Sequence, residues 1–240
     1  MNREYHKWFS PALQREMELL IFGSGGTRVL VFPTSLGRFY QWEDFGMLEP
    51  LRPHLEDGAI QLFCVDSVDA ESWYAKWRPP DERVRRHAEY DRYLLEEVAP
   101  FTAKRNPTPA LITTGASFGA FHAANFAFRH PELVTRVLGM SGLYDMRGFA
   151  AGASDETLYF YNPSDYLANE QDQERLDALR RIDIILAIGR DDPSCANNEA
   201  FSSVLWSKDI WHALRIWDGW AHDWPYWKQM VSLYIDGHDY

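Results

Sequence analysis

The sequence has few cysteines, no long apolar run and no cluster of positive charge. Its two cysteines, Cys64 and Cys195, stand far apart, so we expect reduced thiols rather than a disulfide framework. No apolar run approaches the about 20 residues that a membrane-spanning helix needs. The first residues, 1–6, lack the apolar core of a signal peptide. We therefore expect a soluble, cytoplasmic protein with no membrane partner.

The charge of the chain argues against nucleic acid as a partner. The sequence carries 24 Lys and Arg against 35 Asp and Glu, a formal net charge of -11, and the basic residues are scattered. A phosphate backbone would need a basic stripe or patch. The eight histidines contain no H-x-x-x-H pair, and the cysteines have no metal-type spacing. We expect no metal and no other cofactor.

The length and the alternation of segments predict one α/β domain over residues 1–240. Short apolar, β-type runs alternate with helical runs, which indicates a mostly parallel sheet with helices on both faces. The predicted parallel strands are 60–65, 110–114, 136–140, 182–188 and 214–217. At the start of the chain, residues 17–22 and 28–32 flank the glycine-rich segment 23–26. That pattern predicts an antiparallel N-terminal hairpin.

Helices are predicted between these strands. The longest covers about 81–100, begins after two prolines and has an apolar stripe along one side. Two more are expected at about 197–210 and 224–234. The interval 141–181 is the only long one between strands, and its part 142–181 is long enough to hold a small cap.

Residues 115–119, Gly-Ala-Ser-Phe-Gly, lie between the predicted strand 110–114 and a helix-forming run at 121–129. A G-x-S-x-G motif in this context places its serine on a sharp strand-to-helix turn, with the Oγ exposed above the sheet. Ser117 is therefore a candidate nucleophile. The alternative is an ordinary glycine-rich turn in which Ser117 caps a helix.

A nucleophilic serine needs a base and an acid that orients the base. Asp191 and Asp192 follow the predicted strand 182–188 and thus reach its carboxyl end, where ligands bind in open α/β sheets. We prefer Asp192 as the acid and keep Asp191 as the close alternative. Both could instead be turn residues before Pro193. Asp145, after the strand 136–140, is a third candidate.

The preferred base is His222, which follows the last predicted strand and precedes the last helix. His212 falls before that strand and His238 lies near the C-terminus, so neither stands at the strand's carboxyl end. His122 lies one turn into the helix after Ser117 and is better explained as a packed or capping residue.

Stabilising the oxyanion of an acyl-transfer reaction needs two N–H donors. The N–H of Phe118 is the first candidate. The second is expected in the loop after the strand 28–32, with Ser35 preferred and Leu36 as the alternative. Pro33 has no N–H to donate. The same segment could also be a simple turn.

These motifs resemble the α/β-hydrolase superfamily, and within it the putative esterase (esterase D-like) family. The resemblance rests on five segments: 115–124, 129–133, 141–145, 189–193 and 222–224. It implies an α/β-hydrolase fold and acyl chemistry. The chain departs from many relatives at the oxyanion loop, where Pro33 and Thr34 replace a His-Gly pair, and at Ala120, which replaces a frequent glycine of the elbow.

Aromatic residues make up 15% of the sequence, and ten of them are tryptophans. Some lie on or near predicted loops at the carboxyl edge of the sheet, where we expect them to form an apolar substrate-binding pocket. These are Trp42, Trp73, Trp77, Trp220 and Trp224. The alternative is that several fill the core or an interface of a homo-oligomer.

Together the motifs predict a serine carboxylic-ester hydrolase that acts on a small-molecule ester through Ser117, His222 and Asp192, with an acyl-enzyme intermediate. Two alternatives stay open. An acyltransferase would pass the same acyl group to an alcohol or amine instead of water. A non-catalytic module of this fold would bind a partner, since a fold alone does not establish a function.

Overall fold

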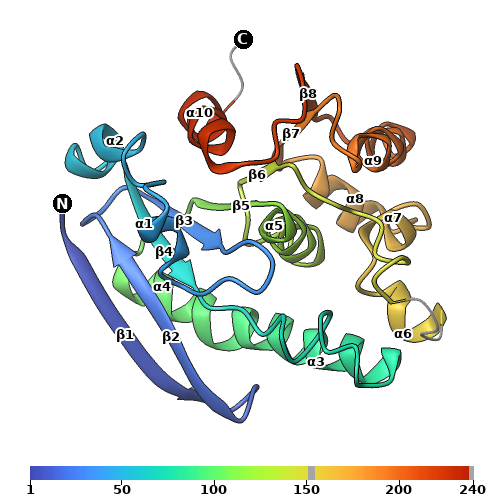
Figure 1. Cartoon of the computed structure of the whole chain (residues 1–240), viewed down its shortest axis with the longest axis horizontal. Helices are drawn as coiled ribbons and strands as arrows, with labels where there is room; N and C mark the ends of the chain where they lie inside the picture. The colour runs from blue at the N-terminus through green and yellow to red at the C-terminus, as the bar shows by residue number, and fades with distance from the viewer. Residues whose placement is uncertain (151–154, 238–240) are drawn as a thin grey trace.

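A central sheet runs through the molecule in the computed structural model, which describes residues 1–150 and 155–237 (Figure 1). Within the described residues the sheet has eight strands in the order β1-β2-β4-β3-β5-β6-β7-β8. The strands are β1 (Arg3–Ser10), β2 (Arg15–Phe22), β3 (Thr27–Phe32), β4 (Ile60–Val65), β5 (Leu111–Ala116), β6 (Arg136–Met140), β7 (Asp183–Gly189) and β8 (Ala213–Trp217). β2 pairs antiparallel with β1 and β4, and all other pairs are parallel. The five predicted parallel strands are thus confirmed.

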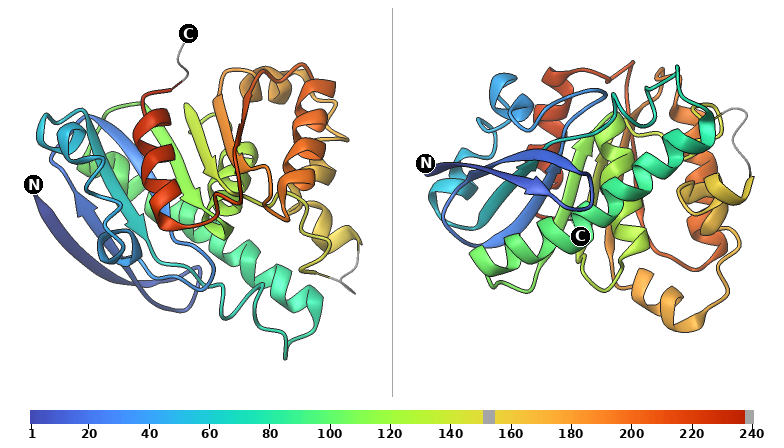
Figure 2. Two further views of the ribbon diagram at one scale, coloured as in Figure 1. Left: turned by 45° about the horizontal axis from the view of Figure 1, so that its top comes forward. Right: turned by 90° about the horizontal axis from the view of Figure 1, so that it is seen from below.

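Helices cover both faces of this sheet. They are α1 (Gln41–Asp44), α2 (Arg52–Glu56), α3 (Pro80–Tyr93), α4 (Ala99–Arg105), α5 (Phe118–Arg129), α6 (Asp155–Tyr159), α7 (Pro163–Tyr166), α8 (Gln173–Leu179), α9 (Cys195–Ser207) and α10 (Trp224–Tyr234). One apolar core joins α3, α5, α8 and α9 to the sheet, and a second joins α1, α2 and α10 to the opposite face. Figure 2 shows α10 in front of the sheet in its left view and α3 in front of it in its right view.

Strands in the middle of the sheet are buried on both sides. Every residue of β4 and β5 is buried. Their near-continuous apolar sequences are typical of parallel strands covered by helices on both faces. Because β3, β5, β6, β7 and β8 pair in parallel, their carboxyl ends lie along one edge of the sheet, where the loops that carry the predicted site begin.

An N-terminal antiparallel hairpin is present, but the prediction that residues 17–22 and 28–32 form its two strands is wrong. β2 pairs with β1, and β3 is separated from β2 by β4. The glycine-rich segment crosses the start of β4 instead of forming a tight turn. A Cβ on Gly26, which has φ of 82°, would lie 2.2 Å from the carbonyl carbon of Ala59. Sequence alone did not reveal β1 because this edge strand mixes charged and aromatic residues and has no continuous apolar face.

The long predicted helix continues beyond its expected end at Pro100. α3 is followed by a π-helical turn, Leu94–Val98, and then by α4. A proline inside a regular α-helix clashes with the carbonyl four residues earlier. Here the chain is wound more widely in the turn just before Pro100, which accommodates the ring and lets the helix continue to Arg105.

The interval 142–181 contains the short helices α6, α7 and α8. Met146, Ala150 and Leu158 from this interval pack against Phe118 and Phe121, in the first turn of α5. The interval therefore lies beside the start of the helix that follows Ser117. A single domain with a small cap in this interval stays a prediction.

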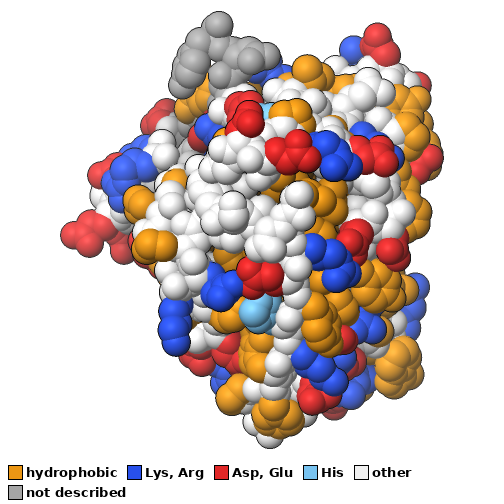
Figure 3. Space-filling model, turned by 90° about the vertical axis from the view of Figure 1, so that its left-hand side faces the viewer, with side chains coloured by type: hydrophobic (Ala, Val, Ile, Leu, Met, Phe, Trp, Pro, Cys, Tyr) orange, Lys and Arg blue, Asp and Glu red, His pale blue; other side chains and the backbone are white. Residues whose placement is uncertain are grey.

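The charged side chains are interspersed on the face that Figure 3 shows, with Lys and Arg next to Asp and Glu. Oppositely charged side chains also form ion pairs in the structure, such as that of Arg86 with Glu89. On this face the basic residues are not gathered into a stripe of the kind that follows a phosphate backbone.

Candidate active site

Ser117 lies on a sharp turn between β5 and α5, in a strained backbone conformation with φ of 54° and ψ of -121°. Two glycines allow this turn. A Cβ on Gly115 would lie 2.4 Å from the carbonyl carbon of Gly119, and a Cβ on Gly119 would lie 2.5 Å from the oxygen of Pro33. The N–H of Ser117 donates to the carbonyl of Met140 over 2.8 Å. Such strain at a non-glycine residue is often found at functional sites.

Ser117, His222 and Asp192 form one hydrogen-bonded chain. His222 Nε2 is 3.0 Å from Ser117 Oγ, and His222 Nδ1 is 2.6 Å from Asp192 Oδ2. The Asp192 side chain is 1% exposed and that of His222 25% exposed. The second oxygen of Asp192 accepts the N–H of Ser194 over 2.8 Å. The carboxylate is thus fixed on both sides, while the imidazole remains accessible.

The two alternative carboxylates, those of Asp191 and Asp145, do not bind His222. Asp191 is exposed, and its N–H donates to the carbonyl of Gly219. Asp145 pairs with Arg147 over 2.7 Å. The neighbours Asp191 and Asp192 differ because they stand in a tight turn after β7, which points adjacent side chains in different directions. Of the three candidates, only Asp192 is hydrogen-bonded to His222.

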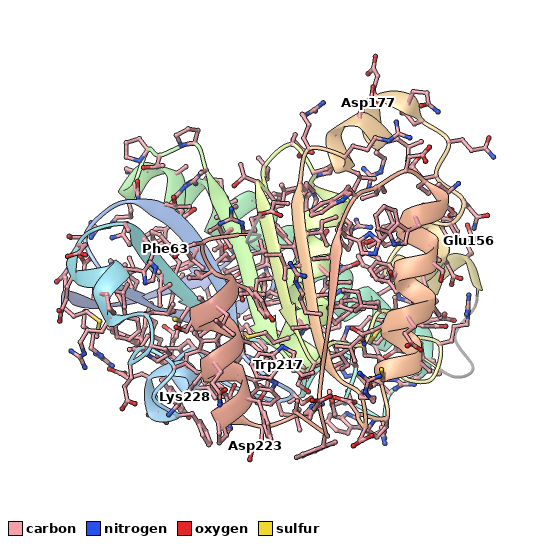
Figure 4. The ribbon with its side chains drawn as sticks, turned by 90° about the horizontal axis from the view of Figure 1, so that it is seen from above. Phe63, Glu156, Asp177, Trp217, Asp223 and Lys228 are labelled. Atoms are coloured by element: carbon pink, nitrogen blue, oxygen red, sulfur yellow. The ribbon has the colours of Figure 1, made fainter. Side chains whose placement is uncertain are left out.

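The segments that carry the carboxylate and the imidazole are held against each other by the backbone. The N–H of Arg190 donates to the carbonyl of Trp217 over 2.8 Å. A Cβ on Gly189 would lie 2.1 Å from the oxygen of Trp220, so only glycine allows this approach. Figure 4 shows Trp217 at the end of β8 and Asp223, just before α10, toward the same edge of the sheet. The hydrogen bond of Arg190 and the close approach at Gly189 hold the segment of Asp192 next to the segment of His222.

A second set of contacts fixes the loop of His222, and the sequence analysis missed it. Trp227 Nε1–H donates to Ser141 Oγ over 3.0 Å, and Ser141 Oγ–H donates to the carbonyl of Ala221 over 2.9 Å. Ser141 and Ala221 have positive φ of 52° and 43°. These contacts join β6, α10 and the residue before His222. The sequence offers only a weak signal, a serine directly after a buried strand.

The backbone N–H groups of Phe118 and Ser35, the two expected oxyanion donors, both lack an acceptor among the hydrogen bonds of the described residues. Phe118 is the first residue of α5, where the N–H has no acceptor within the helix. The N–H of Leu36, the alternative to Ser35, instead donates to Asp69 Oδ2 over 3.1 Å.

Backbone hydrogen bonds orient the peptide that carries the Ser35 N–H. The N–H of Gly37 donates to the carbonyl of Thr34 over 2.8 Å, and the N–H of Thr34 donates to Gln41 Oε1 over 2.8 Å. Because a trans peptide points its C=O and N–H in opposite directions, the Ser35 N–H points away from Gly37. Within residues 1–150 and 155–237, it makes no hydrogen bond to the protein.

Two of the other candidate histidines, His212 and His122, are buried and pair with other side chains. His212 is buried and pairs with Ser202 over 2.6 Å, while its other ring nitrogen faces a backbone carbonyl. His122 pairs with Asp69 over 2.8 Å. His238 lies outside the described residues.

The five tryptophans that were expected to bind substrate fall into two groups. Trp42 and Trp73 are 1% and 0% exposed and belong to the core, so for them the prediction of an open pocket is wrong. Trp42 packs against one face of the sheet and Trp73 packs against Phe121 of α5. Sequence did not separate this packing role from pocket lining. Trp77 and Trp220 are 75% and 52% exposed, and Trp224 is partly buried.

Two aromatic rings, those of Trp220 and Trp227, contact the imidazole of His222. Trp220 stacks on the imidazole, with ring centres 5.6 Å apart. Trp224 stacks on Phe45 with ring centres 4.2 Å apart, and its other ring contact is with Trp227. An apolar rim therefore borders the side of the site that is formed by the His222 loop.

A tyrosine that the sequence analysis missed borders the loop 33–37, which follows β3. Tyr74 Oη–H donates to Ser35 Oγ over 2.7 Å. Its ring meets those of Phe118 and Phe149 edge-on, at 5.3 and 5.4 Å. Burial raises the pKa of Tyr74 above its ordinary value, so the hydroxyl keeps its proton at neutral pH.

In the part of the chain that the structure describes, no group of three or more His, Cys, Asp or Glu side chains is arranged to hold a metal ion. In the same part, no helix has the length and apolar character to cross a bilayer.

The strand order, the turn at Ser117 and the loops at one sheet edge define an α/β-hydrolase fold. The model of the family described as "Putative esterase" matches residues 54–232. This chain therefore belongs to the putative esterase family.

Solved structures of esterases have a similar fold. A ferulic acid esterase aligns with a TM-score of 0.77 and 17% identity, over 97% of this chain and 95% of that one. The S-formylglutathione hydrolase of Agrobacterium tumefaciens aligns with a TM-score of 0.76 and 14% identity, over 98% and 93% of the two chains. The enterobactin esterase FES of Shigella flexneri aligns with a TM-score of 0.70 and 19% identity, over 97% of this chain and 58% of that one. No curated protein matches the sequence. Identities this low show a shared fold only.

Proposed function

We propose that this protein is a serine carboxylic-ester hydrolase in which Ser117 is the nucleophile, His222 the base and Asp192 the orienting acid. The observation that carries the proposal is the continuous hydrogen-bonded chain between them, at 3.0 and 2.6 Å. Membership of an esterase family supports the same reaction class.

In the first half of the reaction, His222 Nε2 accepts the proton of Ser117 Oγ while the oxygen attacks the ester carbonyl. Asp192 holds the Nδ1–H and stabilises the imidazolium. The tetrahedral oxyanion accepts hydrogen bonds from the N–H groups of Phe118 and Ser35. His222 then gives its proton to the leaving alcohol, and the acyl group stays on Ser117.

In the second half, water replaces the alcohol. His222 takes a proton from water, and the hydroxyl adds to the acyl carbonyl. Collapse of this second tetrahedral intermediate breaks the bond to Ser117 Oγ, which recovers its proton from His222. The products are one carboxylic acid and one alcohol for each ester and water consumed.

The rim of the site favours a small ester with an apolar or aromatic part. Trp220 is half exposed and stacks on His222, and Trp224 with Phe45 continues the apolar surface. Aromatic side chains at such positions contribute through buried area and ring stacking. We propose Trp220 and Trp224 as substrate-binding residues.

Hydrolysis of p-nitrophenyl acetate, butyrate and benzoate by the wild type and by Ser117→Ala tests the proposal. We expect turnover of each ester by the wild type and a loss of at least about 10⁴-fold in kcat in the variant. Ser202→Ala is a matched control, because Ser202 also pairs with a histidine, at 2.6 Å. Equal activity of the Ser117 variant and the wild type would overturn the assignment.

The same assay separates hydrolysis from acyl transfer. Product analysis with an added alcohol or amine shows whether the acyl group reaches water or the acceptor. A transfer product as the main species would make the protein an acyltransferase that uses the same three residues. A folded wild type with no turnover of any ester would favour a binding module.

A further inference from the structure

A second carboxylate–imidazole pair lies behind the site, and the proposed reaction does not use it. Asp69 Oδ1 and His122 Nε2 are 2.8 Å apart, and their side chains are 0% and 1% exposed. Asp69 follows β4, and His122 lies in the second turn of α5. Burying a carboxylate is costly unless donors surround it. Its donors therefore indicate its role.

One of these donors belongs to the oxyanion loop, which we define as residues 33–37. Leu36 N–H donates to Asp69 Oδ2 over 3.1 Å. Leu36 has φ of 58°, a strained value for a bulky residue, and it is 52% exposed. Packing of the side chain therefore does little to hold this conformation, whereas a hydrogen bond to a carboxylate is among the stronger ones.

The other donor belongs to the helix that begins after Ser117. The ring of His122 packs against those of Phe32, Tyr90 and Phe118, with centres 5.1 to 6.0 Å apart. The second nitrogen of His122 is buried and has no hydrogen-bond partner within residues 1–150 and 155–237. Asp69 is thus the side chain that holds the imidazole through a hydrogen bond.

The oxyanion loop and α5 also touch directly, where Gly119 packs against the carbonyl of Pro33. The loop is also held by the bonds of Thr34 to Gln41 and of Ser35 to Tyr74, but neither partner belongs to α5. The bond of Asp69 to Leu36 is a second point of attachment, one residue beyond Ser35. The loop is thus linked to α5 at two points, which limits how the Ser35 N–H can move relative to that of Phe118.

We propose that Asp69 is a positioning residue that, together with His122, ties the oxyanion loop to α5 and so keeps the two oxyanion donors aligned. This inference rests on the proposed function, because it assigns Ser35 and Phe118 to the oxyanion. Donors that are already in place before the reaction stabilise the transition state without reorganisation. Asp69 then affects turnover without touching the substrate.

Asp91 provides a matched control for a purely structural role. It is also buried, and it accepts hydrogen bonds from Arg129 over 3.0 Å and from His130 over 3.2 Å. These partners lie at the opposite end of α5 from Ser117. Replacing Asp91 removes a similar buried carboxylate but leaves the oxyanion loop intact.

The test compares Asp69→Ala, Asp69→Asn and Asp91→Asn in kcat, in KM and in the Ki of an alkyl trifluoromethyl ketone. The hemiketal of this inhibitor places an oxyanion at the donors. We expect kcat to fall about 100-fold in Asp69→Ala, as for loss of one oxyanion donor, with KM changed less than about twofold. Asp69→Asn keeps one acceptor oxygen, so about a tenfold loss is expected.

The Ki of the ketone should rise by the same factor as kcat/KM falls, which a general loss of stability would not produce. Asp91→Asn should lower Tm but change kcat less than about threefold. Wild-type turnover in both Asp69 variants, or a loss no larger than that of Asp91→Asn at equal Tm, would overturn the proposal. Should Asp69→Ala fail to fold, the isosteric Asp69→Asn decides.

Amide hydrogen exchange at Leu36 gives a readout that is independent of activity. Exchange should be slow in the wild type and at least about tenfold faster in Asp69→Ala. Faster exchange in a protein without esterase activity would contradict the proposed function but not the anchoring of the loop. Unchanged exchange would contradict the anchoring itself.

Discussion

Two histidine–carboxylate pairs lie near Ser117, with almost equal separations and different surroundings. His222 and Asp192 are 2.6 Å apart, and the second nitrogen of His222 faces the Ser117 hydroxyl at 3.0 Å. His122 and Asp69 are 2.8 Å apart, and the second nitrogen of His122 has no partner in the described part of the chain. The His222 side chain is 25% exposed and that of His122 is 1% exposed.

The comparison teaches that a histidine–carboxylate bond does not by itself identify a catalytic pair. A general base needs an accessible nitrogen next to the proton that it removes. Only the pair of His222 meets that condition. The pair of His122 is enclosed by aromatic rings, and its carboxylate turns its free oxygen to a backbone N–H. The first pair is suited to proton transfer and the second to holding a loop.

The largest expected effect comes from neutralising the carboxylate of the exposed pair. Asp192→Asn should lower kcat about 10⁴-fold, because an amide no longer stabilises the imidazolium or selects the correct tautomer. Its neighbour Asp191 is exposed and gives the matched control. Asp191→Asn should retain kcat within about twofold. The reverse order of the two variants in a p-nitrophenyl acetate assay would contradict the assignment of the acid.

A smaller effect is expected from the contacts that hold the His222 loop. Ser141→Ala removes the hydrogen bonds to Trp227 and to the carbonyl of Ala221. A typical hydrogen bond contributes about 0.5–1.5 kcal/mol, so kcat should fall about 3- to 10-fold. Ser202→Ala removes another buried hydroxyl and should leave kcat unchanged. An unaltered kcat in Ser141→Ala would show that the loop is held without it.

Trp220 tests whether the exposed pair is bordered by a binding surface. Trp220→Ala should raise KM for an aryl ester about tenfold and for an acetyl ester much less, since it removes about 1.4 kcal/mol of apolar contact. Trp206 is equally exposed, at 52%, and lies on α9. Trp206→Ala is therefore the control. Equal KM values for both variants with every ester would remove Trp220 from the substrate site.

The smallest effect concerns the pH dependence of stability, through a buried histidine next to the pair of His122 and Asp69. His87 contacts His122, and burial lowers the pKa of His87 well below its ordinary value of 6.5. Below about pH 6.5 the unfolded chain binds a proton that the folded chain does not, so the free energy of unfolding falls as pH falls, by up to about 1.4 kcal/mol per pH unit. Above pH 6.5 this contribution is fully present.

Urea unfolding at pH 8 and pH 5.5 measures this slope. His87→Gln keeps a polar group near Asn125, to which His87 Nε2 is 3.3 Å away. The variant should lose less stability between the two pH values than the wild type, by about 1 kcal/mol. An identical loss in both proteins would show that His87 does not titrate differently on folding.

The arrangement of Ser117, Asp192 and His222 was predictable because each follows a strand of the same sheet. Parallel strands end at one edge, so residues just after them converge there. The choice between Asp191 and Asp192 depends on the geometry of the turn after β7. Their adjacent positions in the sequence do not show which side chain points toward His222. Leu36 could not be excluded as an oxyanion donor from the sequence either, because its N–H binds Asp69, which lies 33 residues further along the chain.

Other features could not be predicted because they depend on which segments meet in space. β1 is an edge strand of mixed charged and aromatic residues without a continuous apolar face, and the partner of β2 is set by the order of strands in the sheet. The burial of Trp42 and Trp73 depends on the helices and loops around them. The pairing of Asp69 with His122 joins residues 53 positions apart.

Labelling with a fluorophosphonate, followed by mass spectrometry of the adduct, tests most directly whether His222 activates Ser117. The account predicts one adduct, on Ser117, that forms in the wild type and in Ser202→Ala but not in His222→Ala. A folded wild type without an adduct on Ser117, or labelling of His222→Ala at the wild-type rate, would contradict it.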